Sequence, residues 1–271
     1  QGVYGYNGVV YSTNEESFVE AFYSEFEKYC IESNIIAEFA RFHPLLNNDG
    51  FSENYMTILS DRKTVALDLS LSIDNIWNNS YSSINRNMIR KAIKSGVNIV
   101  VSEVEEDYIK FLEIYSETMN NVHASEYYLF DKQYISNFKI LLKNNHKLLV
   151  AEYKGEIICA MLLMYMGNFA HYHLSGRKKN FSKLAANNLI LDEAIKFAKH
   201  EGCSYFHFGG GNTSEESDFL LKFKSNFSKE FRCFKIGKRI HNQKIYQQVV
   251  SQWRQQNPEK VQSKMLLKYR Y

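Results

Sequence analysis

The sequence predicts a mixed α/β (α+β) fold of two tandem units with mixed sheets, the first unit being N-terminally incomplete. From residue 148 onward, the expected elements follow the order β-β-β-α-β-α-β, which is typical of a mixed sheet covered by helices on both faces. The first hundred residues repeat the later part of that order as strand, helix, strand, connection and strand. We therefore expect a partial first unit with a linking helix at 1–96, and a complete second unit with a C-terminal helix at 97–271.

Local patterns predict the elements of the first unit. Strand formers predict strands over 2–12, 35–42 and 64–71. A stripe of aromatic residues at helical spacing predicts a helix over 15–33. That stripe consists of Phe18, Phe22, Phe26 and Tyr29. The linking helix is expected over 77–96, where basic residues, among them Arg86, recur at helical spacing.

The second unit has clearer signals. Apolar residues three and four apart predict helices over 106–122 and 182–199, the second ending at Gly202. A further helix is expected from Ser214, because acidic residues favour a first helical turn, and a polar helix is expected from Gln243. The expected strands are 148–152, 156–166, 169–174, 205–208 and 231–240, the first two forming a hairpin.

Composition excludes several classes of protein. With 45% hydrophobic and 23% charged residues the chain is globular, and its net charge of +3 is too mild to indicate DNA binding. No apolar run approaches the roughly 18 residues of a membrane span, so at most a peripheral membrane association is expected. The four widely spaced cysteines predict reduced core thiols and a cytoplasmic location.

No common catalytic or metal signature is present. The sequence has no Walker loop, GxGxxG, HExxH or GxSxG motif. His171 and His173 lie two apart on a strand without an evident third ligand, so no metal site is expected.

Two junctions in the second unit are candidate binding segments. Ser175 and Arg177 precede a helix start that carries several basic residues, which favours an anion there; a solvated basic loop is the alternative. Gly209, Gly210 and Gly211 end a buried strand, where exposed backbone lets a ligand approach; a flexible turn is the alternative.

Lys224 lies beside the expected buried stripe of its helix, which places it at the edge of a pocket near the three glycines. The alternative for any lone lysine is a surface residue whose stem alone is buried. In the first unit, the segment 38–44 is the counterpart of the glycine strand end, and it contains Arg41 and His43. A cation on such an apolar strand needs an internal acid or a ligand phosphate or carboxylate.

Taken together, these segments resemble the FemAB (FemX-like) branch of the GNAT-fold acyltransferases. The resemblance rests on YHLSG, AANNLILDEAIKFAKHEG, YFHFGGG, FKSNFS and FKIGKRIHN, with AEFARFHPL, YSSINRNMIRKAIKSGV and ETMNNVHASEYYLF earlier in the chain. It covers about residues 1–250 and implies two GNAT-like units in tandem. One departure concerns the R/Q-x-x-G-x-G/A motif of acetyl-CoA enzymes: the segment starting at Arg177 lacks both glycines, as FemAB-type members do.

The resemblance implies transfer of an acyl or aminoacyl group to an amine of a cell-envelope precursor, either a peptidoglycan peptide or an amino-sugar nucleotide. Aminoacyl-tRNA or acyl-CoA would be the donor, and no cofactor is required. Lys224 matches a lysine expected beside the reacting carbonyl, and Arg41 matches an arginine expected on the acceptor. His173 and His207 are the candidates for a general base.

Two other functions remain open at this point. One is an acetyl-CoA-dependent N-acetyltransferase of surface-polysaccharide synthesis, and the other is a non-catalytic ligand-binding protein on the same fold. The substrate-binding candidates are Arg41, His43, Arg86, Ser175, Arg177, Gly209, Gly210 and Gly211.

Overall fold

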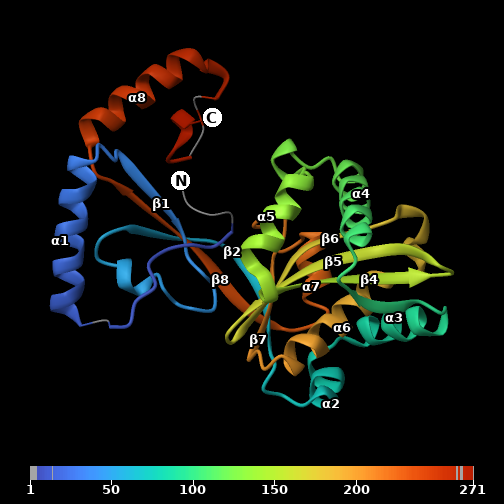
Figure 1. Cartoon of the computed structure of the whole chain (residues 1–271). Helices are drawn as coiled ribbons and strands as arrows, with labels where there is room; N and C mark the ends of the chain where they lie inside the picture. Colours follow the sequence, from blue (N-terminus) through green and yellow to red (C-terminus); the bar gives the residue numbers. More distant parts are fainter. Residues whose placement is uncertain (1–4, 14, 261, 263–264, 271) are drawn as a thin grey trace. The chain divides into compact units, whose positions relative to one another are not determined.

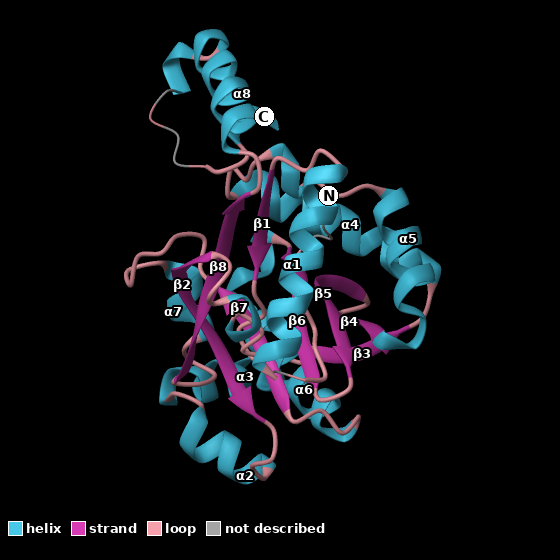
Figure 2. Ribbon diagram, turned by 90° about the vertical axis from the view of Figure 1, so that its left-hand side faces the viewer, coloured by secondary structure: helices cyan, strands magenta, loops and turns pink. Residues whose placement is uncertain are grey.

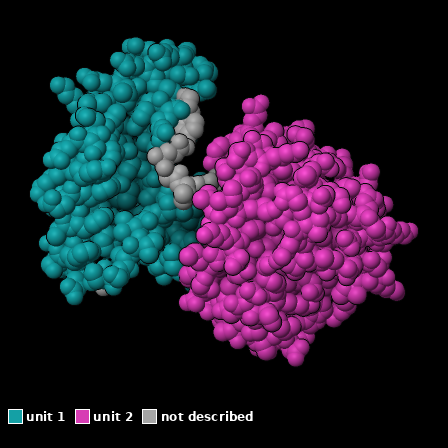
Figure 3. Space-filling model, in the orientation of Figure 1, with its two compact units in different colours: residues 1–63, 232–271 teal, residues 64–231 magenta. Residues whose placement is uncertain are grey.

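A computed structural model describes residues 5–13, 15–260, 262 and 265–270. It divides the chain into two compact units, 1–63 with 232–271, and 64–231 (Figure 3). This division differs from the sequence boundary at 96, because the segment 64–96 belongs to the same compact unit as 97–231. The sequence boundary concerns a duplication of the fold, and it stays a prediction.

The unit 64–231 is built on a mixed sheet. Its hydrogen-bonded order runs β2-β7-β6-β5-β4-β3, and β1 and β8 continue the series as β1-β8-β2. The bounds are β2 (Thr57–Asp68), β3 (Asn98–Ser102), β4 (His146–Tyr153), β5 (Glu156–Met166), β6 (Phe169–Arg177) and β7 (Tyr205–Gly210). The β6–β7 pair is parallel, and the β2–β7, β3–β4, β4–β5 and β5–β6 pairs are antiparallel. The predicted α/β class with a mixed sheet is confirmed.

Helices cover both faces of this sheet (Figure 1). On one face, α3 (Ser83–Lys94) and α6 (Ala186–His200) bury apolar side chains against the strands. On the other face, α4 (Glu105–Asn121) and α5 (Lys132–Leu142) build a second apolar cluster. The strands between these layers are buried on both sides, which explains the continuous apolar run of β5.

The other unit contains α1 (Glu16–Glu32), β1 (Ala37–Arg41), β8 (Glu230–Ile240) and α8 (Gln243–Gln256) (Figure 2). β1 and β8 pair in antiparallel register from Ala37↔Ile240 to Arg41↔Ile236. Short helical turns complete the described chain. They are Gly50–Ser52, α2 (Ile73–Asn75), the π-turn Ile76–Ser80, Glu126–Tyr128, Lys143–Asn145, Lys179–Leu184, α7 (Phe219–Lys224), Pro258–Lys260 and Lys268–Arg270.

Several expected elements need correction. Of the strand predicted at 2–12, residues 2–4 lie outside the described part, and the rest makes a single bridge, Asn7↔Phe42. The helix expected from Ser214 begins at Phe219, because the carboxylate of Asp218 caps it there. The helix expected over 77–96 is a π-turn followed by α3, since Ser82 caps a new helix start. β3 and α5 were not predicted.

All four cysteines are unpaired. Cys30, Cys159 and Cys203 are buried as expected, whereas Cys233 is exposed, so the prediction of four core thiols was wrong at this position. Cys233 lies on β8, and alternate residues of a strand point to opposite faces.

Gly176→Ala should destabilise the protein, because β6 passes very close to α4 at this glycine. A Cβ at position 176 would lie 2.7 Å from the Tyr115 backbone. We expect a loss of about 1–3 kcal/mol in the free energy of unfolding, measured by chemical denaturation. Gly50→Ala is the matched control, because a Cβ there meets open space, and it should stay within about 0.5 kcal/mol. Equal effects of the two substitutions would contradict the close approach.

Candidate functional site

The two central parallel strands separate in mid-course. The ladder between β6 and β7 consists of three pairs, from Phe169↔Tyr205 to His171↔His207. Beyond His171, β6 continues to Arg177 on its partner β5, and β7 continues to Gly210 on its partner β2. Backbone edges that diverge in this way can receive an extended ligand by strand-like hydrogen bonds. Ligands of open α/β sheets also bind at the carboxyl ends of such strands.

Lys224 ends α7 and reaches the carboxyl end of β7. Its side chain is only 6% exposed, and Nζ donates a 2.6 Å hydrogen bond to the Gly210 carbonyl oxygen. Nζ also lies 5.4 Å from the ring centroid of Tyr172 on β6, in a cation–π arrangement. The structure thus brings Lys224 together with Gly209 and Gly210, and the alternative of a solvated surface lysine does not describe it.

Burial changes the charge state of this lysine. Removal from water lowers the pKa of Lys224 to about 7, and the negative charge of Asp218 opposes that shift without cancelling it. An amine with such a pKa exists in both protonation forms near neutral pH.

The glycines make room for Lys224. Gly209 has a φ of +77°, a backbone conformation that favours glycine, and a Cβ there would lie 3.4 Å from Lys224 Nζ. A Cβ at Gly211 would overlap the carboxylate of Asp218. Gly210 contributes its carbonyl oxygen to the lysine.

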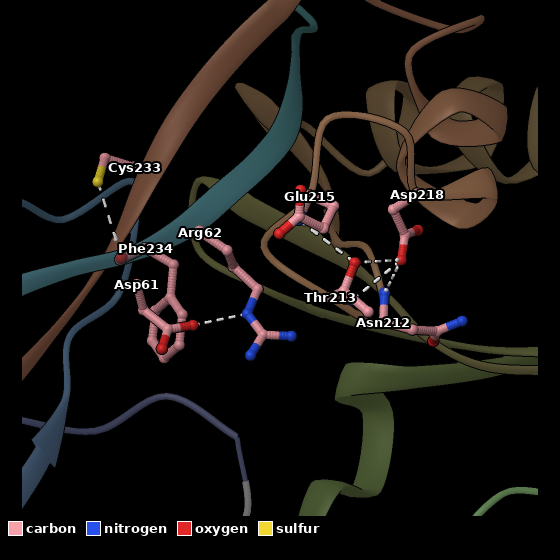
Figure 4. A network of polar contacts seen from close by, with 8 residues as sticks. All are labelled: Asp61, Arg62, Asn212, Thr213, Glu215, Asp218, Cys233 and Phe234. Atoms are coloured by element: carbon pink, nitrogen blue, oxygen red, sulfur yellow. Dashed lines mark hydrogen bonds and ion pairs between the residues drawn. The ribbon is translucent and has the colours of Figure 1, made fainter. Parts of the chain in front are cut away.

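Asp218 holds the glycine loop and α7 together, and the sequence analysis did not single it out. Its Oδ2 accepts hydrogen bonds from the backbone N–H groups of Asn212 and Thr213 and from the Thr213 hydroxyl (Figure 4). Its Oδ1 accepts from the first-turn N–H groups of Leu220 and Leu221. The spacing of an aspartate immediately before a helical apolar pattern is an N-cap signal that could have identified it.

The charge of Asp218 is stabilised by these contacts. Burial alone would raise the pKa of the carboxyl, but the hydrogen bonds from Leu221, Thr213 and Leu220 outweigh burial and lower it. Asp218 is therefore a fixed negative charge beside the helix that carries Lys224.

A group of polar side chains lies between β6, β5 and the first turn of α6. Ser175 lies near Tyr172 and Cys159, and burial raises the pKa values of the Tyr172 hydroxyl and the Cys159 thiol to about 12, although Ser175 opposes that shift. The Cys159 thiol lies 3.4 Å from Asn187 Oδ1 in the first turn of α6. The Tyr172 ring in this group faces Lys224.

The two candidate histidines lie elsewhere. His173 stacks on Phe138 and its Nε2 lies 2.6 Å from the Tyr134 hydroxyl, both on α5, and burial lowers the pKa of His173 to about 4. His207 is buried with its Nδ1 3.3 Å from His171 Nδ1. Its strand neighbours Phe206 and Phe208 belong to the core on the α3–α6 face, so His207 points to the other face. The structure therefore does not bring these histidines to Lys224.

The remaining candidates of this unit have structural partners. Arg86 Nη1 donates to the carbonyl oxygens of Trp77, Asn78 and Tyr81, and so caps the end of the π-turn. Arg177 is exposed, and its backbone N–H donates to the Thr118 hydroxyl. Its guanidinium lies close enough to Tyr172 and Cys159 to lower their pKa values slightly against the effect of burial.

Arg41 and His43 belong to the other compact unit. The Arg41 guanidinium lies 5.7 Å from the ring centroid of Phe234. His43 Nδ1 accepts a hydrogen bond from the Leu45 N–H, and burial lowers the pKa of His43 to about 4. Their predicted contact with an acceptor substrate stays a prediction.

The basic junction after β6 is partly closed to anions. The N–H of Lys179 donates a 3.2 Å hydrogen bond to the carboxylate of Glu117, and the N–H groups of Phe181 and Ala185 donate to backbone carbonyls. A short helical turn, Lys179–Leu184, separates this junction from α6. A phosphate at Lys179 would have to displace the exposed Glu117 carboxylate.

Across the described residues, no three His, Cys, Asp or Glu side chains gather as metal ligands. In that same part of the chain, no helix is both long enough and apolar enough to cross a membrane.

Asp218→Ala should destabilise the protein more than Asp131→Ala. Asp131 caps α5 through a single hydrogen bond from Tyr134 N, and loss of such a cap costs about 0.5–2 kcal/mol. Asp218 also holds Asn212 and Thr213, so its loss frees two further backbone groups. Equilibrium unfolding in denaturant measures both variants, and equal losses would contradict the role assigned to Asp218.

The contribution of Asp218 to the free energy of unfolding should decrease as the pH falls. Because its folded-state pKa is lowered, its stabilisation is present above the pKa of the unfolded chain and is lost as the pH falls through the folded-state value. The difference in unfolding free energy between the protein and Asp218→Ala should therefore shrink on acidification.

Lys224→Met should raise the stability of the protein at neutral pH. The unfolded chain holds a proton on this amine up to its ordinary pKa of 10.5, whereas the folded chain loses it near 7. The advantage of the methionine variant should then shrink by up to about 1.4 kcal/mol per pH unit between about pH 7 and 9. Lys222→Met, at an exposed position of the same helix, should show no such trend; a parallel trend there would refute the burial argument.

Comparisons with known proteins agree with this architecture. The fold is similar to that of FemX, at 14% identity and a TM-score of 0.71, covering 85% of this chain and 78% of that one. It is also similar to L-PGS from Bacillus licheniformis, at 14% identity and a TM-score of 0.59, covering 83% of this chain and 74% of that one. A conserved protein of unknown function from Bacteroides thetaiotaomicron shows 13% identity and a TM-score of 0.58, with coverages of 81% and 75%. At such identities the likeness concerns the fold alone.

Among curated proteins, none matches this chain in sequence. The family model described as acetyltransferase (GNAT) domain matches residues 81–224, which is more than half of the 271 residues. The matched segment ends at Lys224 and contains β6, β7 and the glycine loop. Acetyltransferases of this family take acyl-CoA as donor and an amine as acceptor, without a metal cofactor. The chain belongs to the acetyltransferase (GNAT) domain family and is an acyltransferase.

Proposed function

We propose that this acyltransferase forms an amide on an amine of a cell-envelope precursor, as the FemAB branch does. We also propose that Lys224 stabilises the carbonyl oxygen of the reacting acyl group. The observation that carries the proposal is the buried Lys224 Nζ at the point where β6 and β7 have separated. A cation fixed there would stabilise the negative charge that develops on the carbonyl oxygen of the acyl group. Among the described residues of the unit 64–231, Lys224 is the only lysine or arginine that is buried.

The class of acceptor rests on the likeness to the FemAB branch. The sequence segments that resemble this branch include the glycine strand end and the Lys224 helix, the two elements that build the site. The similar folds include FemX and a domain assigned to lysylphosphatidylglycerol synthetase from Agrobacterium fabrum (14% identity, TM-score 0.57, covering 83% of this chain and 74% of that one). A peptidoglycan peptide or an amino-sugar nucleotide, met in the cytoplasm or at the membrane surface, is the acceptor class we propose.

Our proposal for the donor is based on the junction after β6. The family implies acyl-CoA, but the segment from Arg177 lacks the two glycines of the pyrophosphate cradle, and Glu117 accepts the hydrogen bond of Lys179 N–H. Both features favour a donor that places no pyrophosphate there, such as aminoacyl-tRNA. An acetyl-CoA-dependent N-acetyltransferase is the second candidate, which the family match favours.

Lys224→Ala should reduce turnover by roughly 100- to 1,000-fold, because the loss of one oxyanion donor costs about 3–4 kcal/mol. The measurement is steady-state transfer with the identified donor and acceptor. Lys222→Ala removes one positive charge from the same helix at an exposed position, and it should leave the rate nearly unchanged. Near-normal activity of Lys224→Ala would exclude the proposed role and favour a non-catalytic function for this lysine.

Calorimetric titration with acetyl-CoA should separate the two donors. A FemAB-type enzyme with aminoacyl-tRNA as donor should show no saturable binding. If acetyl-CoA binds with its pyrophosphate at the β6–α6 junction, Glu117→Gln should tighten binding, because it removes a negative charge beside Lys179 N–H. Glu113→Gln, an exposed position one helical turn earlier on α4, is the matched control. Saturable binding that Glu117→Gln strengthens would establish the N-acetyltransferase alternative.

A further inference from the structure

We propose that Lys224 also accepts the proton of the attacking amine, so that one side chain serves first as general base and then as oxyanion donor. This inference rests on the proposed function, since it assigns a second task to the lysine at the same site. It supplies the general base for which neither candidate histidine is suitably placed.

The surroundings of Nζ fit a neutral amine. An ammonium group has three N–H donors and needs several acceptors or an acidic partner when it is buried. Within the described residues, the hydrogen bond of Lys224 Nζ goes to the Gly210 carbonyl oxygen, and no carboxylate forms an ion pair with it. A neutral amine can donate one N–H to that carbonyl and keep its lone pair for an incoming proton.

The lone pair of Lys224 Nζ has space beside it. Gly209 lacks the Cβ that would stand 3.4 Å from Nζ, and β6 and β7 are no longer paired at this point, since their pairing ends at His171↔His207. An acceptor amine bound along the diverging strands would meet Nζ directly. The two candidate histidines cannot replace it, because His173 packs with Tyr134 and His207 with His171 on the opposite face of the sheet.

Nearby groups keep both forms of the amine accessible. Burial favours the neutral form, while the carboxylate of Asp218 before α7 favours the ammonium form. From β6, the Tyr172 ring face attracts the ammonium form, and the Tyr172 hydroxyl stays protonated because burial raises its pKa to about 12. A general base works best when its pKa lies near the working pH.

The proton and electron balance is simple. The neutral acceptor amine attacks the carbonyl carbon of an activated ester or thioester, and a C–N bond forms as the carbonyl oxygen becomes negative. The nitrogen gives its proton to Lys224 Nζ, and the resulting ammonium hydrogen-bonds to the oxyanion. When the carbon–heteroatom bond of the donor breaks, the departing alcohol or thiol takes the proton from Lys224, which restores the neutral amine.

The pH dependence of the rate distinguishes this scheme from oxyanion stabilisation alone. The assay follows p-nitrophenol release from p-nitrophenyl acetate that depends on added methoxyamine, a weakly basic amine that is already neutral well below the pKa of Lys224. If Lys224 is the proton acceptor, kcat/KM should rise with pH through the pKa of Lys224, since the neutral amine is the active form. If Lys224 acts only as a cation, kcat/KM should fall with pH through that same pKa.

Two substitutions sharpen the test. Lys224→thialysine, whose amine is less basic, should move the rising limb to lower pH, while Lys222→thialysine should leave it in place. Lys224→Arg keeps the positive charge but cannot accept a proton, so it should abolish the rising limb, with folding checked by its thermal unfolding. A falling limb, or an Lys224→Arg variant with full activity, overturns the inference and leaves the proposed function standing. If the unaltered protein shows no methoxyamine-dependent release, both the proposed function and this inference fail.

Discussion

The hydrogen bond from Lys224 Nζ to the Gly210 carbonyl, made inside the protein, is the constraint on which the site depends. A buried lysine costs stability, because the folded chain either holds a charge in a poorly polar place or releases a proton that the unfolded chain keeps. The features around it serve to hold it there. Gly209 leaves room for Nζ, Tyr172 faces it from β6, and Asp218 fixes both the glycine loop and the helix that carries the lysine. An arrangement that lowers the stability of the fold in this way points to function, since an apolar side chain at position 224 would give a more stable core.

Much of the fold could be predicted from the sequence, because its strongest signals are local. The hairpin of β4 and β5 follows from two apolar runs around a tight turn, and α1, α4 and α6 follow from helical spacing of apolar residues. The start of α7 was missed because Glu215 and Glu216 suggested a first turn, whereas the deciding interaction is the double capping by Asp218. The division into compact units depends on contacts between distant segments, 1–63 with 232–271, which no local pattern reveals.

The site was predictable in part. Three glycines at a strand end and a lysine beside an apolar helical stripe indicated the place where Lys224 meets Gly210. The histidines were misleading as indicators, because one β-bulge in β6 and the alternation of side chains along β7 decide which face each ring occupies. Tyr172 and Asp218 were overlooked, since their roles come from contacts to Lys224 and to backbone N–H groups rather than from a motif.

The most direct test of this account is the titration of Lys224 itself, followed by NMR of the lysine side-chain carbons and nitrogen, with the Lys224 signal assigned by its loss in Lys224→Met. The account predicts a midpoint near pH 7, because burial outweighs the field of Asp218. A midpoint near the ordinary value of 10.5 would show a solvated ammonium group, and it would contradict the buried, proton-accepting lysine on which the site is built.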